Sequence, residues 1–159
     1  MQLTIEPEAA NSPIATQLIA ELSAELGAIY GDDGDGGFDP SDVMVPRAAF
    51  VVAWADGQAV GCGALRPMPD ATIAEIKRVY VCSSMRGRGI SRQIMNYLEN
   101  SARQFGYIGL MLESARGSVQ RHGLVAEHAQ VGQHELRPAL MEVAKEHEPQ
   151  PLAARAHRH

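Results

Sequence analysis

The sequence predicts an α/β domain built on a mixed, mostly antiparallel β-sheet. Three strand-like segments follow one another at residues 48–54, 59–65 and 72–81, and the turn Asp56-Gly57 joins the first two as an antiparallel hairpin. The third segment leads through a glycine-containing turn into a helix and a further strand, so residues 72–113 form a strand–helix–strand unit. Because a helical crossover of this kind joins parallel strands with a right-handed connection, the sheet should contain both kinds of pairing.

The first thirty residues predict a short strand followed by an amphipathic helix. Leu3 and Ile5 alternate with polar neighbours, as in a half-buried strand. Ser12 is a suitable N-cap, and Pro13 is a suitable first helical residue. A helix over residues 13–30 is indicated by apolar residues at helical spacing, namely Ile14, Leu18, Ile19, Leu22, Leu26 and Ile29.

The next segments supply the rest of the sheet and its crossover helix. Residues 48–54 are rich in β-branched and aromatic side chains, as expected of a buried strand. Gly61 and Gly63 in the returning strand indicate close approach of another backbone or a ligand. The crossover helix should end at Gly106 and be followed by a strand at 107–113. Its expected buried face contains Ile90, Ile94, Tyr97, Leu98 and Phe105.

Length and composition exclude several classes of protein. The chain has 159 residues, 45% of them apolar, which suits one domain with a sizeable core and excludes wholesale disorder. A formal net charge of −5 disfavours a general nucleic-acid-binding protein. The longest apolar run, residues 48–55, is far shorter than the about 20 residues of a membrane span. With no basic, apolar leader at the start, we expect a cytoplasmic protein with no membrane or nucleic-acid partner.

Neither the cysteines nor the acidic loop indicates a metal centre. Cys62 and Cys82 lack the CxxC spacing of a zinc site, and a reducing compartment is expected. Because no histidine precedes His122, these cysteines are interpreted as ordinary small residues and not as nucleophiles. The Asp- and Gly-rich segment 31–37 lacks the ligand spacing of a calcium loop and is interpreted as a mobile turn.

The segment Arg86-Gly-Arg-Gly-Ile-Ser91 has the composition of a phosphate-binding turn. Its glycines let consecutive N–H groups converge, and the helix that follows carries about half a positive charge at its N-terminus. Its spacing fits neither the dinucleotide fingerprint nor a Walker loop. Five bases and no acid lie between residues 77 and 92, which indicates a local anion site: Lys77, Arg78, Arg86, Arg88 and Arg92. The alternatives are a plain turn whose arginines face water, or a polyanion site that binds nucleic acid.

From Glu75 to Ser91 the sequence resembles the acetyl-CoA-binding core of the GNAT superfamily of N-acetyltransferases. That family's signature is Gln/Arg-x-x-Gly-x-Gly/Ala at the start of a helix, and Arg86, Gly89 and Ser91 occupy its fixed positions. Ser91 departs from the usual Gly or Ala but is still small. The glycine-containing hairpin strand and the strand after the helix also resemble the family in order and spacing, so the resemblance covers roughly residues 1–114.

The resemblance implies transfer of an acetyl group from acetyl-CoA to the primary amine of a small molecule or amino acid. Main-chain groups at Val79, Tyr80 and Val81 would bind the pantetheine arm, and an amide near Val79 would polarise the thioester carbonyl. Glu75 is the candidate general base, and the alternative is a solvent-facing charge that pairs with Lys77. The pyrophosphate would be held by main-chain N–H groups of Arg86, Gly87, Arg88, Gly89, Ile90 and Ser91.

Beyond residue 114 the resemblance is lost. All eight aromatic residues lie at or before residue 107 and all six histidines after residue 121, so the tyrosine that often serves the family as general acid has no counterpart. Either the ending is divergent and mainly helical, with a helix from Pro138, or a frameshift near codons 113–116 has replaced it. We expect one domain over residues 1–147 and a disordered tail over 148–159.

The altered ending has two expected consequences. Loss of the last strands would expose a sheet edge and permit a homodimer. Loss of the general acid leaves a second functional hypothesis, in which the chain is a non-catalytic or impaired acyl-CoA-binding module.

Overall fold

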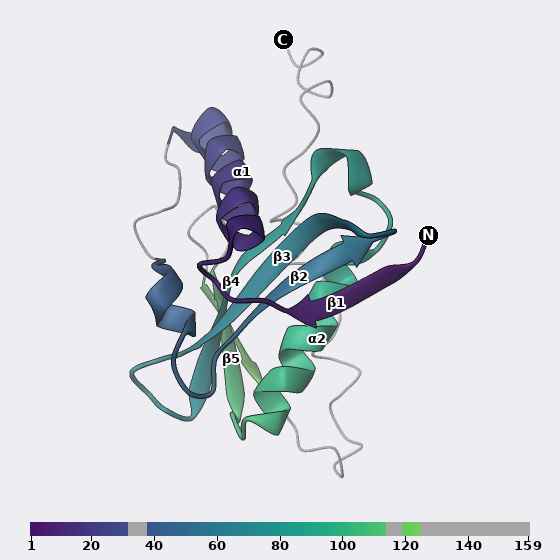
Figure 1. Cartoon of the computed structure of the whole chain (residues 1–159). Helices are drawn as coiled ribbons and strands as arrows, with labels where there is room; N and C mark the ends of the chain where they lie inside the picture. Colours follow the sequence, from purple (N-terminus) through teal and green to yellow (C-terminus); the bar gives the residue numbers. More distant parts are fainter. Residues whose placement is uncertain (32–37, 114–118, 125–159) are drawn as a thin grey trace.

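A computed structural model describes residues 1–31, 38–113 and 119–124 of the chain (Figure 1). Three expectations from the sequence lie outside the described residues: the turn at 32–37, the helix from Pro138 and the tail at 148–159. In the described ranges, no helix has both the length and the apolar character needed to cross a membrane. The elements in chain order are β1 (Leu3–Pro7), α1 (Pro13–Tyr30), η2 (Pro40–Val43), β2 (Ala49–Ala55), β3 (Gln58–Pro67), β4 (Ile73–Val81), η3 (Ser83–Met85), α2 (Ile90–Gln104), β5 (Gly109–Glu113) and β6 (Val119–Gly123).

The strands form one mixed sheet in the order β1-β2-β3-β4-β5-β6. Strands β1 to β4 are antiparallel neighbours, β4 and β5 are parallel, and β6 returns antiparallel to β5. The expected mixed, mostly antiparallel sheet is therefore confirmed. The expected loss of all strands after residue 114 was wrong, because β6 occupies Val119–Gly123. Its sequence, Val-Gln-Arg-His-Gly, carries little β-propensity, and the backbone of β5 supplies its pairing instead.

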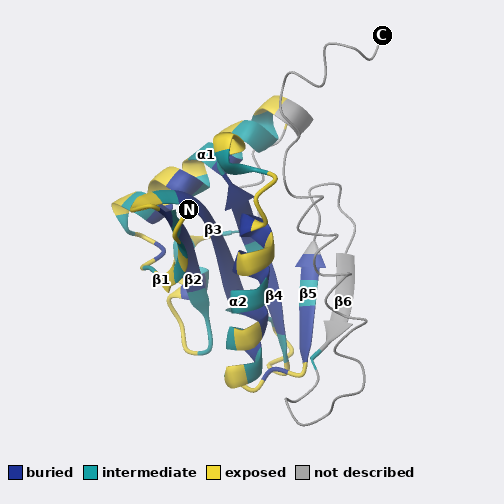
Figure 2. Ribbon diagram, turned by 90° about the vertical axis from the view of Figure 1, so that its right-hand side faces the viewer, coloured by how far each residue is buried: buried dark blue, intermediate teal, exposed yellow. Residues whose placement is uncertain are grey.

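The two helices cover opposite faces of the sheet, which gives three layers (Figure 1). Helix α1 packs through Leu18 and Leu22 on one core cluster, which includes Phe50 and Tyr80. Helix α2 packs on a second cluster through the side chains of Ile90, Ile94, Met95, Leu98 and Ala102. Because both faces of the sheet are covered, nearly all residues in the middle of β2, β3 and β4 are buried, and these strands are largely dark blue in Figure 2.

Local signals fix the ends of the elements as the sequence predicts. The Ser12 side chain accepts a hydrogen bond from the Ala15 N–H at 3.1 Å, so Ser12 caps α1 with Pro13 in the first turn. The Asp56-Gly57 turn has positive φ at both residues, as a two-residue hairpin of this sequence requires. Gly106, with φ of 85°, follows the end of α2, and the next N–H bonds back to the Ala102 carbonyl.

Gly61 and Gly63 lie where α2 presses against the sheet, as their position in the sequence indicates. A Cβ atom at Gly61 would lie 2.5 Å from the carbonyl oxygen of Tyr80. A Cβ at Gly63 would lie 2.7 Å from Ile94 and 2.9 Å from Leu98. The two glycines thus let β4 and α2 approach β3 closely enough to place the N-terminus of α2 beside the end of β4.

Candidate functional site

The parallel strands β4 and β5 are paired over only part of the length of β4. Their pairing runs from Ile73 opposite Gly109 to Ile76 opposite Leu112 and ends there, whereas β4 continues to Val81 (Figure 2). A bulge contributes to this parting, because Arg78 has φ of 57° where the register with β3 shifts. A bulge bends its strand and is frequent beside functional sites. The second half of β4 therefore has no described strand on its β5 side.

Main-chain groups of Val79 and Val81 face this opening. The N–H of Cys82 bonds to the Val60 carbonyl at 2.8 Å, and Cys82 therefore points its N–H toward β3. Backbone polarity alternates along a strand, so Tyr80 also faces β3, whereas Val79 and Val81 face the other way. The Val81 carbonyl accepts a hydrogen bond from Nε of Arg86 at 3.0 Å. The remaining groups of these two valines are in a position to bind an extended amide chain.

The glycine turn at the start of α2 has the backbone of an anion site. Gly87 and Gly89 have φ of 77° and 76°, and Gly89 is the N-cap of α2 with no side-chain cap. The first N–H to enter the helical ladder is that of Gln93, which bonds to the Gly89 carbonyl at 3.2 Å. The N–H groups of the three preceding helical residues are open to an anion, whose charge the helix dipole favours.

The side chain of Arg86 connects this turn to β4 and α1. Its Nε donates a hydrogen bond to the Val81 carbonyl at the end of β4, and its Nη2 lies 2.7 Å from the Glu25 carboxylate on α1. Its guanidinium also lies 5.9 Å from the centre of the Tyr80 ring. The side chain of Arg86, the first residue of the signature, is thus engaged within the fold and holds the turn in place.

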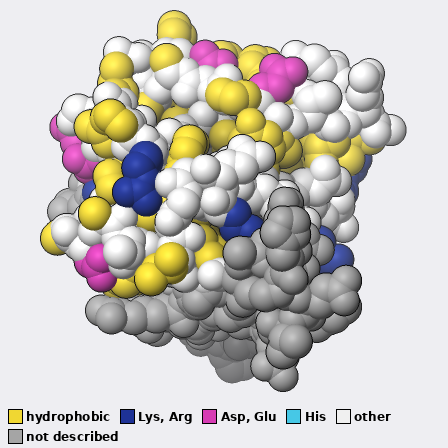
Figure 3. Space-filling view, turned by 90° about the horizontal axis from the view of Figure 1, so that it is seen from below, with side chains coloured by type: hydrophobic (Ala, Val, Ile, Leu, Met, Phe, Trp, Pro, Cys, Tyr) yellow, Lys and Arg dark blue, Asp and Glu magenta, His cyan; other side chains and the backbone are white. Residues whose placement is uncertain are grey.

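The five bases between residues 77 and 92 do not form one cluster, contrary to the expectation of a single anion site. Arg78 is buried, with its guanidinium 5.2 Å from the Phe38 ring, and Lys77 lies 3.9 Å from the Glu75 carboxylate. Only Arg88 and Arg92 are exposed beside the turn. The bulge and the alternation of β4 separate the five bases, which adjacency in sequence does not show. On the face in Figure 3, Lys and Arg side chains likewise stand apart among hydrophobic and uncharged ones.

Glu75 lies at the foot of the opening, one residue before the parallel pairing ends. Its side chain is 8% exposed, so the alternative of a solvent-facing charge does not hold, although the pairing with Lys77 that it included is present. Both Nε and Nη2 of Arg66 lie 2.9 Å from its Oε2, while its Oε1 faces Lys77 at 3.9 Å. Arg66 stands opposite Glu75 on β3, and two cations therefore compensate one buried carboxylate.

Arg66 also ties Glu75 to the segment that follows α1. Its Nη1 lies 2.8 Å from Oδ2 of Asp42 in η2, and the same oxygen accepts the Asp39 N–H at 3.1 Å. The sequence did not indicate Asp42 or Arg66 as site residues. No spacing rule connects them to Glu75, because the bulged register between β3 and β4 makes the contact.

The two cysteines are poor nucleophiles in this fold. Burial raises the pKa of the Cys62 thiol, whose Sγ donates to the Arg78 carbonyl. Burial, with the Glu21 carboxylate beside it, raises the pKa of Cys82 as well. Burial is also the main cause that raises the pKa of Tyr80, whose hydroxyl donates to Glu21 at 3.2 Å. These groups stay neutral near pH 7, which supports reading both cysteines as structural.

The chain is similar to known acetyltransferases. Residues 19–127 match the acetyltransferase (GNAT) family, so the match extends beyond residue 114. The sequence is 33% identical over 112 residues to the "IAA acetyltransferase" of Azospirillum brasilense, covering 70% of this chain and 73% of that protein.

Solved structures share the fold. A Klebsiella pneumoniae protein designated an acyl-CoA N-acyltransferase superposes with a TM-score of 0.57 at 27% identity, over 71% of this chain and 72% of that one. An aminoglycoside 6'-N-acetyltransferase complexed with coenzyme A gives 0.54 at 24% identity, over 70% and 61%. The second likeness concerns the fold alone.

Proposed function

This chain belongs to the GNAT family of acetyltransferases, and we propose that it acetylates the primary amine of a small molecule or amino acid. The acetyl donor is acetyl-CoA, as the chain's membership of this acetyltransferase family implies. The observation that carries the proposal is the parting of β4 from β5 directly beside an anion-binding turn. Acetyl-CoA needs both features. Its pantetheine amides can pair with the free edge of β4, and its diphosphate can bind to converging N–H groups.

We assign the donor to this opening from its backbone chemistry. The open N–H groups at the start of α2, those of Ile90, Ser91 and Arg92, suit the diphosphate. The exposed side chains of Arg88 and Arg92 add positive charge. Val79 and Val81 present main-chain groups for the amides of the pantetheine arm. An N–H near Val79 is proposed to stabilise the oxyanion that forms on the thioester carbonyl.

In the proposed reaction the acceptor amine attacks the thioester carbonyl carbon. A new C–N bond forms, the C–S bond breaks, and the thiolate of coenzyme A leaves. The amine must first lose a proton from its ammonium form, and Glu75 is proposed to take it, directly or through a water molecule. Oε1 of Glu75 has the weaker of the two sets of contacts, so this oxygen is the proposed proton acceptor.

Residues 108–159 contain no tyrosine, so this segment supplies no phenol to protonate the departing thiolate. A thiolate is a good leaving group at neutral pH, and transfer does not require that proton. We therefore propose an active enzyme and not a non-catalytic acyl-CoA-binding module.

Release of free thiol from acetyl-CoA separates these two functions. The acceptor panel should contain amino acids, small primary amines and aminoglycosides, with acetyl-CoA alone as the blank. We expect at least one acceptor to raise thiol release well above the blank, and Glu75→Gln to lower that rate about 100-fold with its pH dependence flattened. Donor binding without amine-dependent release for any acceptor would contradict the proposed transfer.

A charge reversal at Arg92 tests the donor site separately from folding. Glutamate in the first turn of a helix is favourable to the helix dipole, so Arg92→Glu should preserve stability. The same carboxylate should repel the diphosphate and weaken acetyl-CoA binding at least tenfold by calorimetry. Asn100→Asp, an exposed change on the same helix far from the turn, is the control and should bind normally.

Two further parts of the proposal concern the cellular location and the oligomeric state of the enzyme. Both cysteines are free, which supports the cytoplasm as its location. A homodimer remains a proposal that sedimentation of the full chain tests directly, with a concentration-independent monomer as the contrary result.

A further inference from the structure

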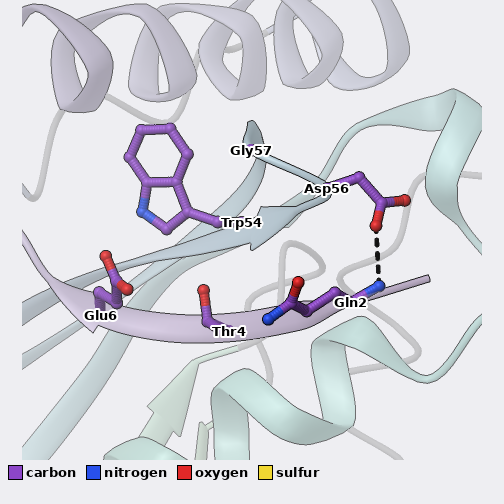
Figure 4. Close-up of a pocket in the computed structure, with 6 residues that line it drawn as sticks. All are labelled: Gln2, Thr4, Glu6, Trp54, Asp56 and Gly57. Atoms are coloured by element: carbon purple, nitrogen blue, oxygen red, sulfur yellow. Dashed lines mark hydrogen bonds between the residues drawn. The ribbon is translucent and has the colours of Figure 1, made fainter.

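A cavity of about 360 Å³ lies at the outer edge of the sheet, between β1 and the β2–β3 hairpin (Figure 4). Thr4 and Trp54 are directly opposite each other in the two strands and form its centre. Strand β1 is three strands from β4, a separation of about 14 Å. The cavity is therefore distinct from the proposed acetyl-transfer site. Its lining consists of Gln2, Thr4, Glu6, Trp54, Asp56 and Gly57.

The indole of Trp54 brings an unused hydrogen-bond donor to this cavity. Part of the ring packs against the core cluster under α1. Its Nε1 is buried and has no hydrogen-bond partner among the residues that the structure describes. Figure 4 shows the nitrogen on the side of the ring that faces Glu6 and Thr4. A buried donor without an acceptor costs about 1–3 kcal/mol, which an oxygen atom of a ligand would recover.

The charges around the cavity are all negative. Glu6 and Asp56 contribute carboxylates, and none of the lining residues is basic. One oxygen of Asp56 is occupied by the Gln2 N–H at 2.9 Å, and Glu6 is exposed on β1. A cation beside an indole also gains from the ring's negative face. These features select a small organic cation that also carries an oxygen acceptor.

We propose that this cavity binds a small amino alcohol in its ammonium form. The ammonium group pairs with the Glu6 carboxylate, and the hydroxyl oxygen accepts a hydrogen bond from Nε1 of Trp54. Because Nε1 is buried, this contact requires the exposed side chains of Thr4 and Glu6 to move when the ligand binds. Binding requires neither acetyl-CoA nor Glu75, so this inference is independent of the proposed acetyl transfer.

Trp54 is the single tryptophan of the chain, so its fluorescence reports on this cavity directly. Ethanolamine is the probe, titrated at constant ionic strength without acetyl-CoA. Ethylamine lacks the oxygen and ethylene glycol lacks the charge. We expect a saturable change with ethanolamine and at least fivefold weaker binding of both analogues. A linear, non-saturable response, or equal affinities for all three, would overturn the proposal.

A matched pair of variants tests the assigned carboxylate. Glu6→Gln should weaken ethanolamine binding at least fivefold, because the charged partner is lost while the side chain keeps its size. Glu8→Gln makes the same change two residues further on, outside the cavity lining, and should bind as the unchanged protein does. Equal affinity in Glu6→Gln and Glu8→Gln would show that Glu6 is not the ligand. Since Glu6 is exposed, neither substitution should unfold the chain, and circular dichroism checks this.

Discussion

Adding one methyl group at Gly61 tests how closely β3 and β4 must approach. The Cβ of Gly61→Ala would lie 2.5 Å from the Tyr80 carbonyl oxygen and 3.2 Å from Cδ1 of Ile94. Real Cβ atoms keep at least 3.0 Å from such atoms, so the two strands must separate by 0.5 Å or more. The obstacle on β4 is backbone, which cannot rotate away as a side chain can.

The expected cost follows from this geometry. Overpacking a core costs about 1–3 kcal/mol, and a backbone obstacle places Gly61→Ala near 2–3 kcal/mol. For a chain of this size each 1 kcal/mol lowers Tm by about 2–4 °C, which predicts a fall of about 4–12 °C. The same displacement moves Val81 and its main-chain groups at the proposed donor site. We therefore also expect about tenfold weaker acetyl-CoA binding.

Two other glycines provide the controls. A Cβ at Gly27 in α1 meets nothing within 4 Å, so Gly27→Ala should stabilise the helix by about 0.8–1 kcal/mol and leave binding unchanged. Gly63→Ala meets only side chains of α2 within 3.0 Å, and should destabilise the protein with less loss of binding. Urea unfolding and calorimetry measure the two effects. If the free energy of unfolding of Gly61→Ala lies within 0.5 kcal/mol of that of the unchanged protein, the close approach of β3 and β4 at Gly61 does not limit stability, and the reasoning is refuted.

Three further predictions rest on single contacts. Arg66→Ala removes the nearer of the two cations at the buried Glu75 carboxylate and leaves Lys77 at 3.9 Å. The free energy of unfolding in urea should therefore fall by about 3–5 kcal/mol. A loss below 1 kcal/mol would contradict a stabilising buried ion pair. The Arg47 side chain donates hydrogen bonds at 2.9 Å to the carbonyls of Phe105 and Ala71, and its guanidinium lies 4.0 Å from the centre of the Tyr107 ring. Arg47→Ala should therefore lower the free energy of unfolding in urea by about 2–3 kcal/mol. An unchanged urea midpoint would show that these contacts do not stabilise the fold. Because burial raises the pKa of Cys82, the unfolded state loses this thiol proton first, and stability should fall as pH rises above the ordinary thiol pKa of about 9. Cys62 and Tyr80 contribute in the same direction, so Cys82→Ala should reduce this slope in urea unfolding without abolishing it. An unaltered slope would assign the pH dependence to the other groups.

The parts of the fold that the sequence predicts correctly depend on neighbouring residues. Ser12 and Pro13 start α1, and Asp56-Gly57 closes the first hairpin, because each signal acts on backbone groups only a few residues away. The same holds for the glycine turn before α2, in which Gly87 and Gly89, two residues apart, both have positive φ. For this reason the family could be inferred from the sequence, and a donor position could be proposed from it.

Contacts between distant segments could not be predicted in this way. Strand β6 forms because β5 offers a backbone partner, and its own residues carry almost no strand signal. The five bases that are neighbours in sequence separate because a bulge at Arg78 changes which side of β4 each one faces. Arg66 meets Glu75 through the same bulged register.

The sequence by itself determined the order of the elements from β1 to β5, the N-cap of α1, the hairpin turn and the positive-φ glycine turn before α2, since all of these depend on local backbone preferences. The tertiary structure alone decided that Glu75 is buried, that Asp42 and Arg66 hold it, and that β4 parts from β5 after Ile76. Those features depend on how strands are paired and where that pairing stops. Pairing is a property of two chain segments at once, and no single segment encodes it.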